Sequence, residues 1–110
     1  FVAHYRCTVI LKGGYSTVCV SDGRTFFSST GNPGMAKGGS GDVLAGLLAG
    51  VLAQGYDTLN ASILSLFIHG LAGDFAAAAF GQDAMRASDL VEYLPAAWLR
   101  VRPVGIARLE

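Results

Sequence analysis

The sequence predicts an α/β fold in which short strands come first and apolar helices follow. Short runs rich in β-branched residues, separated by turn residues, occupy positions 7–27, which is typical of strands. Longer apolar segments that end in glycine occupy positions 41–80, which is typical of helices. The chain has 110 residues, 52% of them hydrophobic. That is the size of one domain, with more apolar residues than a free-standing domain of this length needs.

Three short strands are expected, over residues 7–11, 17–20 and 25–27. The first has the sequence CTVIL, a pattern typical of a strand covered on both faces. Residues 12–16 interrupt the strand pattern, and Ser21-Asp22-Gly23-Arg24 predicts a tight turn before the third strand. The order of elements is therefore strands, then a glycine-rich loop, then helices.

The first helix is expected from Gly41 to Gln54, with Gly55 after its end. Leucine and valine recur at helical spacing along one face. Each glycine inside a helix costs up to ~1 kcal/mol relative to alanine, so a second element is expected to pack closely against the opposite face. That face has only small residues, namely Ala45, Gly46, Ala49, Gly50 and Ala53.

A second helix is expected from an Asn60 cap to Phe80, stopped by Gly81. It is apolar nearly all round, so it should be buried. The segment approaches the thickness of a bilayer, but His69 and Asp74 would be costly in lipid. We therefore expect a buried helix and no membrane partner.

Asp89 and Glu92 predict the acidic start of a third helix, which Pro95 should end or kink. Two or three short strands cannot bury helices this apolar. Residues 1–110 are therefore expected to form the C-terminal portion of a single, larger α/β domain.

The charges and cysteines exclude several classes of protein. Eight basic and eight acidic residues cancel, so nucleic acid is not an expected partner. Cys7 and Cys19 lie in strand-like runs and predict reduced core cysteines rather than a disulfide or a metal pair. No secretory signal is visible at the start, and a cytoplasmic protein is expected. The excess of apolar residues favours a homo-oligomer or contact with more of the same fold.

The run from Gly31 to Asp42 (GNPGMAKGGSGD) leads directly into the first helix. Its glycines allow the backbone to approach a ligand closely, and a helix start offers unpaired N–H groups and a partial positive charge. The N–H groups of Gly39, Ser40 and Gly41 are therefore predicted to bind phosphate, with Asp42 as a general base beside it. The alternative is a glycine-rich connector in which Asp42 only caps the helix.

Two common phosphate motifs are excluded. The lysine of the Walker loop is missing before Ser40, and Leu44 stands where the dinucleotide fingerprint needs its third glycine. Lys12 ends a strand, where ligands of open α/β sheets bind, although an edge lysine that only covers apolar surface is an alternative. His69 is expected to be a satisfied buried histidine, and Lys37 to project into solvent.

At these residues the chain resembles the ADP/ATP-dependent NAD(P)H-hydrate dehydratases, a repair-enzyme branch of the ribokinase-like superfamily. The run GNPGMAKGGSGDVLAGLLAG matches their signature, supported by LKGGYSTVCV, HGLAGD and SDLVEYLP. The resemblance covers residues 5–100. It implies the C-terminal portion of a ribokinase-like three-layer sandwich that uses ADP or ATP, with Mg²⁺ expected beside ATP. The implied reaction dehydrates the S-form of NADH or NADPH hydrate.

The resemblance also implies roles for individual residues. Asp42 would contact the hydrate and act as the base, and Asn32 in the Asn-Pro-Gly-Met lead is predicted as a second substrate contact. Ser16 replaces the usual threonine and keeps its hydroxyl. By the resemblance, the nucleotide would contact Lys12, Gly13, Gly14, Tyr15, Ser16 and Gly41. The helix-start donors add Gly39 and Ser40 to the predicted nucleotide contacts.

Two alternatives remain open from the sequence. One is a small-molecule kinase of the same superfamily that phosphorylates a sugar or pyrimidine alcohol. It shares the need for Asp42 and the anion loop. The other is a non-catalytic fragment that serves folding or association, which the apolar excess favours.

Overall fold

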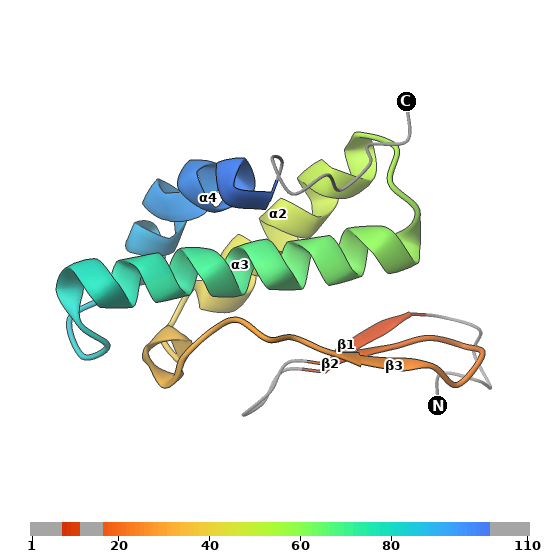
Figure 1. Ribbon diagram of the computed structural model, residues 1–110, viewed down its shortest axis with the longest axis horizontal. Helices are drawn as coiled ribbons and strands as arrows, with labels where there is room; N and C mark the ends of the chain where they lie inside the picture. Colours follow the sequence, from red (N-terminus) through yellow and green to blue (C-terminus); the bar gives the residue numbers. More distant parts are fainter. Residues whose placement is uncertain (1–7, 12–16, 102–110) are drawn as a thin grey trace.

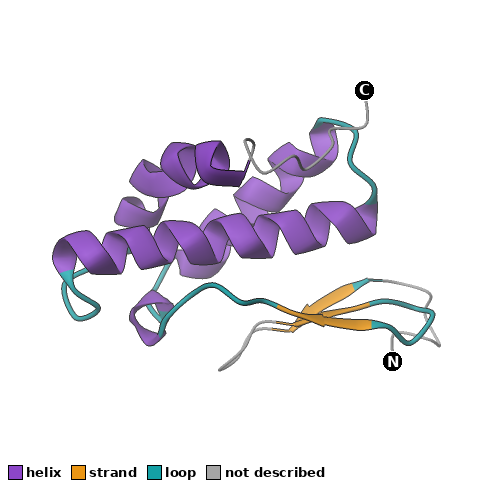
Figure 2. Ribbon diagram, viewed as in Figure 1, coloured by secondary structure: helices purple, strands orange, loops and turns teal. Residues whose placement is uncertain are grey.

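The computed structural model describes residues 8–11 and 17–101 (Figure 1). Figure 2 shows a layer of strands on one side and helices on the other, with the longest helix, α3, lying against the sheet. The elements in order are β1 (Val9–Leu11), β2 (Thr17–Cys19), β3 (Thr25–Phe27), the 3-10 turn η1 (Pro33–Met35), α2 (Ser40–Ala53), α3 (Thr58–Phe80) and α4 (Ala87–Val101).

The three strands lie within the predicted ranges and pair antiparallel in the order β1-β2-β3. Val18 at the centre faces Ile10 on β1 and Phe26 on β3. The predicted turn joins β2 to β3. There the backbone N–H of Arg24 donates to Asp22 Oδ1 at 3.0 Å. This hydrogen bond, helped by the Arg24 guanidinium, holds the pKa of the Asp22 carboxyl below its usual value.

One face of the sheet packs on the helices. Val18 is buried there with Leu44 of α2 and Leu66 of α3, and Ile10 and Phe26 pack against them. On the other face Phe27 is 72% exposed. The described residues therefore leave that face partly open at β3, and the expectation that the strand at residues 7–11 is covered on both faces stays a prediction.

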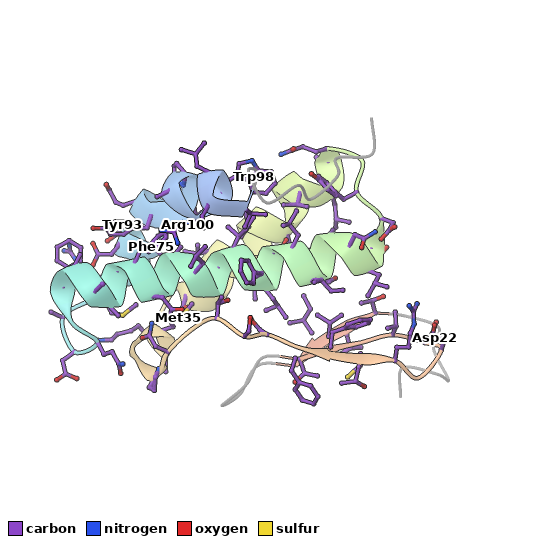
Figure 3. All side chains as sticks on the ribbon, in the orientation of Figure 1. Asp22, Met35, Phe75, Tyr93, Trp98 and Arg100 are labelled. Atoms are coloured by element: carbon purple, nitrogen blue, oxygen red, sulfur yellow. The ribbon has the colours of Figure 1, made fainter. Side chains whose placement is uncertain are left out.

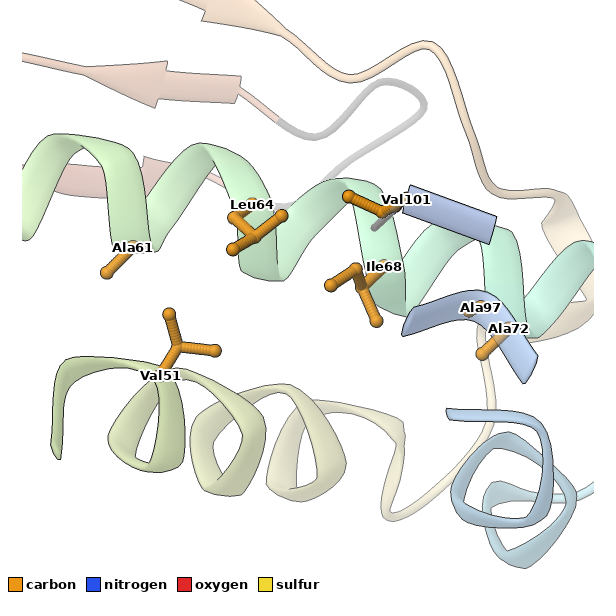
Figure 4. Close-up of a cluster of buried hydrophobic side chains, with 7 residues drawn as sticks. All are labelled: Val51, Ala61, Leu64, Ile68, Ala72, Ala97 and Val101. Atoms are coloured by element: carbon orange, nitrogen blue, oxygen red, sulfur yellow. The ribbon is translucent and has the colours of Figure 1, made fainter. Parts of the chain in front are cut away.

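The main core lies between α3 and the two other helices (Figure 4). Because α3 contacts the sheet as well as α2 and α4, it must be apolar nearly all round, as predicted. Among the described helices α3 alone is long and apolar enough to cross a membrane, yet half of the qualifying stretch is buried inside the structure. The core residues are Val51, Ala61, Leu64, Ile68, Ala72, Ala97 and Val101.

The helix starts differ from the predicted ones. α2 begins at Ser40, one residue early, because Gly39 serves as its N-cap in the left-handed conformation with φ +93°. α3 begins at Thr58, and its cap is Asp57 rather than Asn60. The Asp57 carboxylate accepts from the Asn60 backbone N–H at 2.8 Å and from the Asn60 side-chain amide at 2.9 Å.

α4 continues through Pro95 to Val101, so the predicted end of the helix at Pro95 is wrong, while the alternative, a kink at Pro95, stays a prediction. Pro95 and Val91, whose carbonyl loses its helical partner, are both exposed, so water can satisfy that carbonyl. The acidic start was predicted correctly. Asp89 Oδ2 accepts from the Arg86 backbone N–H at 2.8 Å.

The small-residue face of α2 does not have the close neighbour that the sequence predicted. A Cβ added at Gly46 or at Gly50 would meet nothing within 4 Å. The leucine and valine face of α2 turns to the core instead, with Leu44 and Val51 buried. Within the described part of the chain, Ala45, Gly46, Ala49, Gly50 and Ala53 are all exposed.

Replacing the cap of α3 should have a measurable cost. We expect Asp57→Ala to lower the free energy of unfolding by about 1 kcal/mol, the usual value for a lost N-cap, as measured by urea unfolding. Asp83→Ala is the control, since the side chain of this exposed residue makes no hydrogen bond or ion pair with the described residues. Equal losses in the two variants would contradict the assignment of Asp57 as the cap.

Candidate anion-binding site at the start of α2

The first turn of α2 presents unpaired backbone donors. The Ser40 N–H donates to Lys37 O at 3.2 Å, and the Val43 N–H closes the first helical hydrogen bond to Gly39 O at 3.1 Å. No acceptor among residues 8–11 and 17–101 takes a hydrogen bond from the N–H groups of Gly39, Gly41 or Asp42. Together with the helix dipole, these donors form an anion-binding arrangement.

Asp42 stands in the first turn of α2, next to those donors. Its side chain is exposed and forms no hydrogen bond or ion pair with any part of the chain that the structure describes. The cap of α2 is Gly39, and no side-chain capping bond is made there. Asp42 therefore does not cap the helix. Its carboxylate is available to a ligand that binds the neighbouring N–H groups.

Ser40 faces the interior and is tied to α3. It is 3% exposed, and His69 is 4% exposed. His69 Nε2 lies 3.0 Å from Ser40 O and 3.5 Å from Ser40 Oγ. Because a carbonyl oxygen only accepts, Nε2 must hold a proton and donate to it. His69 is thus the satisfied buried histidine that the sequence predicted, and it fixes the start of α2 on α3.

The beginning of the glycine loop is also bonded to α3. Thr30 Oγ1 donates to Phe67 O at 2.9 Å. The Gly31 N–H donates to Asp74 Oδ2 at 3.1 Å, and Asn32 Nδ2 donates to Asp74 Oδ1 at 2.9 Å. One carboxylate therefore binds the backbone of one loop residue and the side chain of the next.

Two glycines of α3 let the loop approach the helix. A Cβ added at Gly70 would lie 2.7 Å from the carbonyl carbon of Thr30, and one at Gly73 would lie 2.7 Å from Met35 Cγ. Both distances are shorter than real Cβ contacts allow. Figure 3 shows Met35 beside α3. The loop is thus packed directly on a glycine face of the helix.

Lys37 corrects an expectation. Its Nζ donates to Asp83 O at 2.8 Å, so the side chain bridges to the segment between α3 and α4 instead of projecting into solvent. This contact fixes the loop from a second side, four residues before Gly41.

The structure brings together four of the predicted site residues, Gly39, Ser40, Gly41 and Asp42. Asn32 lies at the start of η1, where Asn32 Oδ1 accepts from the Gly34 N–H at 2.9 Å. The predicted nucleotide contacts Lys12, Gly13, Gly14, Tyr15 and Ser16 lie outside the described residues.

Sequence reasoning missed the contribution of Asp74. The available signal was its spacing from Gly70, because residues four apart share a face of a helix. A helix that places glycine and a carboxylate on one face can bind a loop backbone there.

The fold and the candidate site define an α/β protein with unpaired N–H groups at a helix start and, beside them, a carboxylate that has no partner among the described residues. Comparison with known proteins identifies the group to which it belongs. The NAD(P)H-hydrate dehydratase family matches residues 1–96, and the chain belongs to this family, as the sequence motifs indicated.

Two curated relatives illustrate the likeness. The chain is 43% identical over 95 residues to the bifunctional NAD(P)H-hydrate repair enzyme Nnr of Moorella thermoacetica, covering 86% of this chain and 18% of that protein. It is 44% identical over 97 residues to the enzyme of the same name from Thermofilum pendens, covering 88% of this chain and 18% of that protein. The chain thus spans less than a fifth of these relatives.

A solved structure confirms the predicted fold class. The Bacillus subtilis ADP/ATP-dependent NAD(P)H-hydrate dehydratase, co-crystallised with ATP and Mg²⁺, matches with a TM-score of 0.85 and 29% sequence identity. The match covers 90% of this chain and 36% of that one. The short strands and apolar helices therefore belong to a ribokinase-like α/β fold.

Proposed function

We propose that the protein containing this chain dehydrates the S-form of NADH or NADPH hydrate in a nucleotide-dependent reaction that restores NADH or NADPH. The observation that supports this most directly is the exposed carboxylate of Asp42 beside three N–H groups, all without a partner in the described part of the chain, which belongs to the dehydratase family. The same site would serve a ribokinase-like kinase. The family match favours dehydration.

Asp42 is proposed as the general base. Its carboxylate accepts the proton of a substrate hydroxyl as that oxygen attacks phosphorus, a contribution worth ~10²–10⁴ in rate. The N–H groups of Gly39 and Gly41 stabilise the negative charge that develops on the phosphoryl group. When bound, the nucleotide would supply the phosphoryl group: the bond from the hydroxyl oxygen to phosphorus would form as the rest of the nucleotide leaves phosphorus. Phosphate would then leave the hydrate carbon as the neighbouring carbon loses a proton, which restores the double bond.

The proposed nucleotide is ADP or ATP, because the Bacillus subtilis relative is ADP/ATP-dependent and was co-crystallised with ATP and Mg²⁺. In the described residues, no group of three or more His, Cys, Asp or Glu is placed to hold a metal ion. Mg²⁺ often binds through substrate phosphates and water with few protein ligands, so a triphosphate with its waters would hold it here. We propose Lys12, Gly13, Gly14, Tyr15, Ser16 and Ser40 as further nucleotide contacts.

The proposal includes a cytoplasmic, homo-oligomeric protein without nucleic-acid or membrane partners. The free thiol of Cys19 supports the cytoplasmic location. The even charge balance supports the absence of a nucleic-acid partner. The exposed small-residue face of α2 gives a surface on which a second copy could pack.

The function is tested by incubating the S-form of NADH hydrate with the protein and following the absorbance of restored dihydronicotinamide. Restoration is expected with ADP or ATP and not without a nucleotide. The same reactions are assayed for phosphorylation of sugar and pyrimidine alcohols. Phosphorylation of an alcohol with no restoration of NADH would replace the dehydratase proposal with the kinase.

A further inference from the structure

We propose that Asp74 and Asn32 are positioning residues that hold the glycine loop on α3 and so place the N–H groups of Gly39 and Gly41 and the Asp42 carboxylate. This inference rests on the proposed function for its kinetic readout. Neither side chain is assigned contact with the reacting atoms. The prediction that Asn32 contacts the substrate is untested, and the proposal concerns the bonds that its side chain makes inside the protein.

The two side chains form a connected set of three hydrogen bonds. Asp74 accepts from the Gly31 N–H on one oxygen and from Asn32 Nδ2 on the other. Asn32 then accepts from the Gly34 N–H on Oδ1. The carboxylate thus receives two donors, and the amide uses both its donor and its acceptor end. We call this set the Asp74–Asn32 clamp.

The clamp satisfies backbone groups that no regular element satisfies. Gly31 and Gly34 lie between the end of β3 and the start of α2, outside any ladder or long helix. Gly34 is buried, so its N–H must find a partner inside the protein. Asp74 is a poor choice for the middle of a helix by propensity, and these bonds are a physical reason for its presence there.

The clamp and His69 hold opposite ends of the loop on the same helix. Asp74 binds Gly31 and Asn32 at the beginning, and His69 binds Ser40 at the end. Both anchors belong to the second half of α3. Since Asp42 is two residues beyond Ser40, its position relative to α3 depends on both anchors, and a small displacement of a catalytic group is costly in rate.

Exchanging the two side chains tests the clamp. In N32D/D74N an amide at position 74 can accept from the Gly31 N–H and donate to a carboxylate at position 32, which still accepts from the Gly34 N–H. All three hydrogen bonds and the net charge are kept. N32D alone sets two carboxylates 2.9 Å apart. D74N alone leaves two donors facing each other, whichever way the amides are turned.

In the protein that contains this chain, we expect N32D to lower kcat for hydrate dehydration at least about tenfold and D74N by roughly three- to tenfold, with smaller changes in KM. The double exchange should return kcat to within about threefold of the parent. This reciprocal rescue would show that the two side chains act through each other. The control that follows separates positioning from a role confined to overall stability.

Asp57 and Asn60 provide a matched control. They form the same kind of carboxylate–amide pair, with a bond of 2.9 Å, but at the far end of α3, about 25 Å away at 1.5 Å per residue. N60D sets two carboxylates side by side as N32D does, and it should leave kcat unchanged. An equal loss of kcat in N60D, or a double exchange as slow as N32D, would overturn the proposal.

Amide hydrogen exchange at Gly31 and Gly34 gives a readout that does not depend on activity. Both N–H groups should be protected in the parent and in the double exchange, and should exchange faster in N32D. Equal exchange in all three proteins would overturn the clamp. If the parent restores no NADH but shows this pattern, the dehydratase proposal fails and the structural role of the clamp stands.

Discussion

Asp42→Asn is expected to lower kcat for hydrate dehydration by ~10²–10⁴ while nucleotide affinity changes by less than about threefold. The substitution keeps the shape of the side chain and removes its ability to accept a proton. The carboxylate is exposed and makes no hydrogen bond within the described residues, so no internal contact is lost. Single-turnover kinetics would measure the chemical step, and calorimetry with ATP would measure binding.

Asp83→Asn is the matched control for this variant, since it removes an exposed carboxylate that has no partner among the described residues and keeps the backbone carbonyl that binds Lys37. Its kcat should equal that of the parent. If Asp42→Asn retained full turnover, Asp42 would not be the base. If it instead lost nucleotide binding with an unchanged chemical step, the carboxylate would act in binding.

Gly70→Ala is expected to lower the free energy of unfolding by about 2–3 kcal/mol, the range for overpacking a filled interior. The new methyl group would lie 2.7 Å from the carbonyl carbon of Thr30 and 2.8 Å from its oxygen. Backbone atoms cannot rotate aside as a flexible side chain can. The loop must therefore move away from α3, and turnover should fall with stability. Denaturant unfolding and steady-state kinetics would measure the two effects.

Gly46→Ala is the opposite case on α2. A Cβ at this position meets nothing within 4 Å, so the full gain in helix propensity should appear, up to ~1 kcal/mol of added stability.

A Gly70→Ala variant as stable as the parent would show that the loop is not packed on α3. A destabilising Gly46→Ala would show that the small-residue face of α2 is covered in the whole protein.

The extents of the strands and helices followed from local patterns. β-Branched runs between turn residues define the three strands, and Gly55 and Gly81 follow the ends of α2 and α3 closely. The errors occurred where two local signals compete. Asp57 and Asn60 are both good caps, and only the backbone geometry selects Asp57. Pro95 usually ends a helix, but packing of Ala97 and Val101 in the core continues this one.

The candidate site also has one part that local sequence predicts and one part that it does not. The donors of Gly39 and Gly41 and the Asp42 carboxylate are neighbours in sequence, so a motif was enough to predict that they act together. The bonds from Asn32 to Asp74 and from Lys37 to Asp83 join residues 42 and 46 positions apart. No local pattern gives such a pairing, because it exists only after α3 has docked.

The attachment of the loop to α3 also has a thermodynamic consequence. Hydrogen bonds across 29 to 46 positions join the loop to the helical layer, so the loop and the helices should order together rather than one after the other. A ligand held by the loop therefore stabilises the whole layer, by about 2.7 kcal/mol at one hundred times its Kd. The unfolding temperature of α3 and α4 then reports on occupancy of a site that neither helix itself contains.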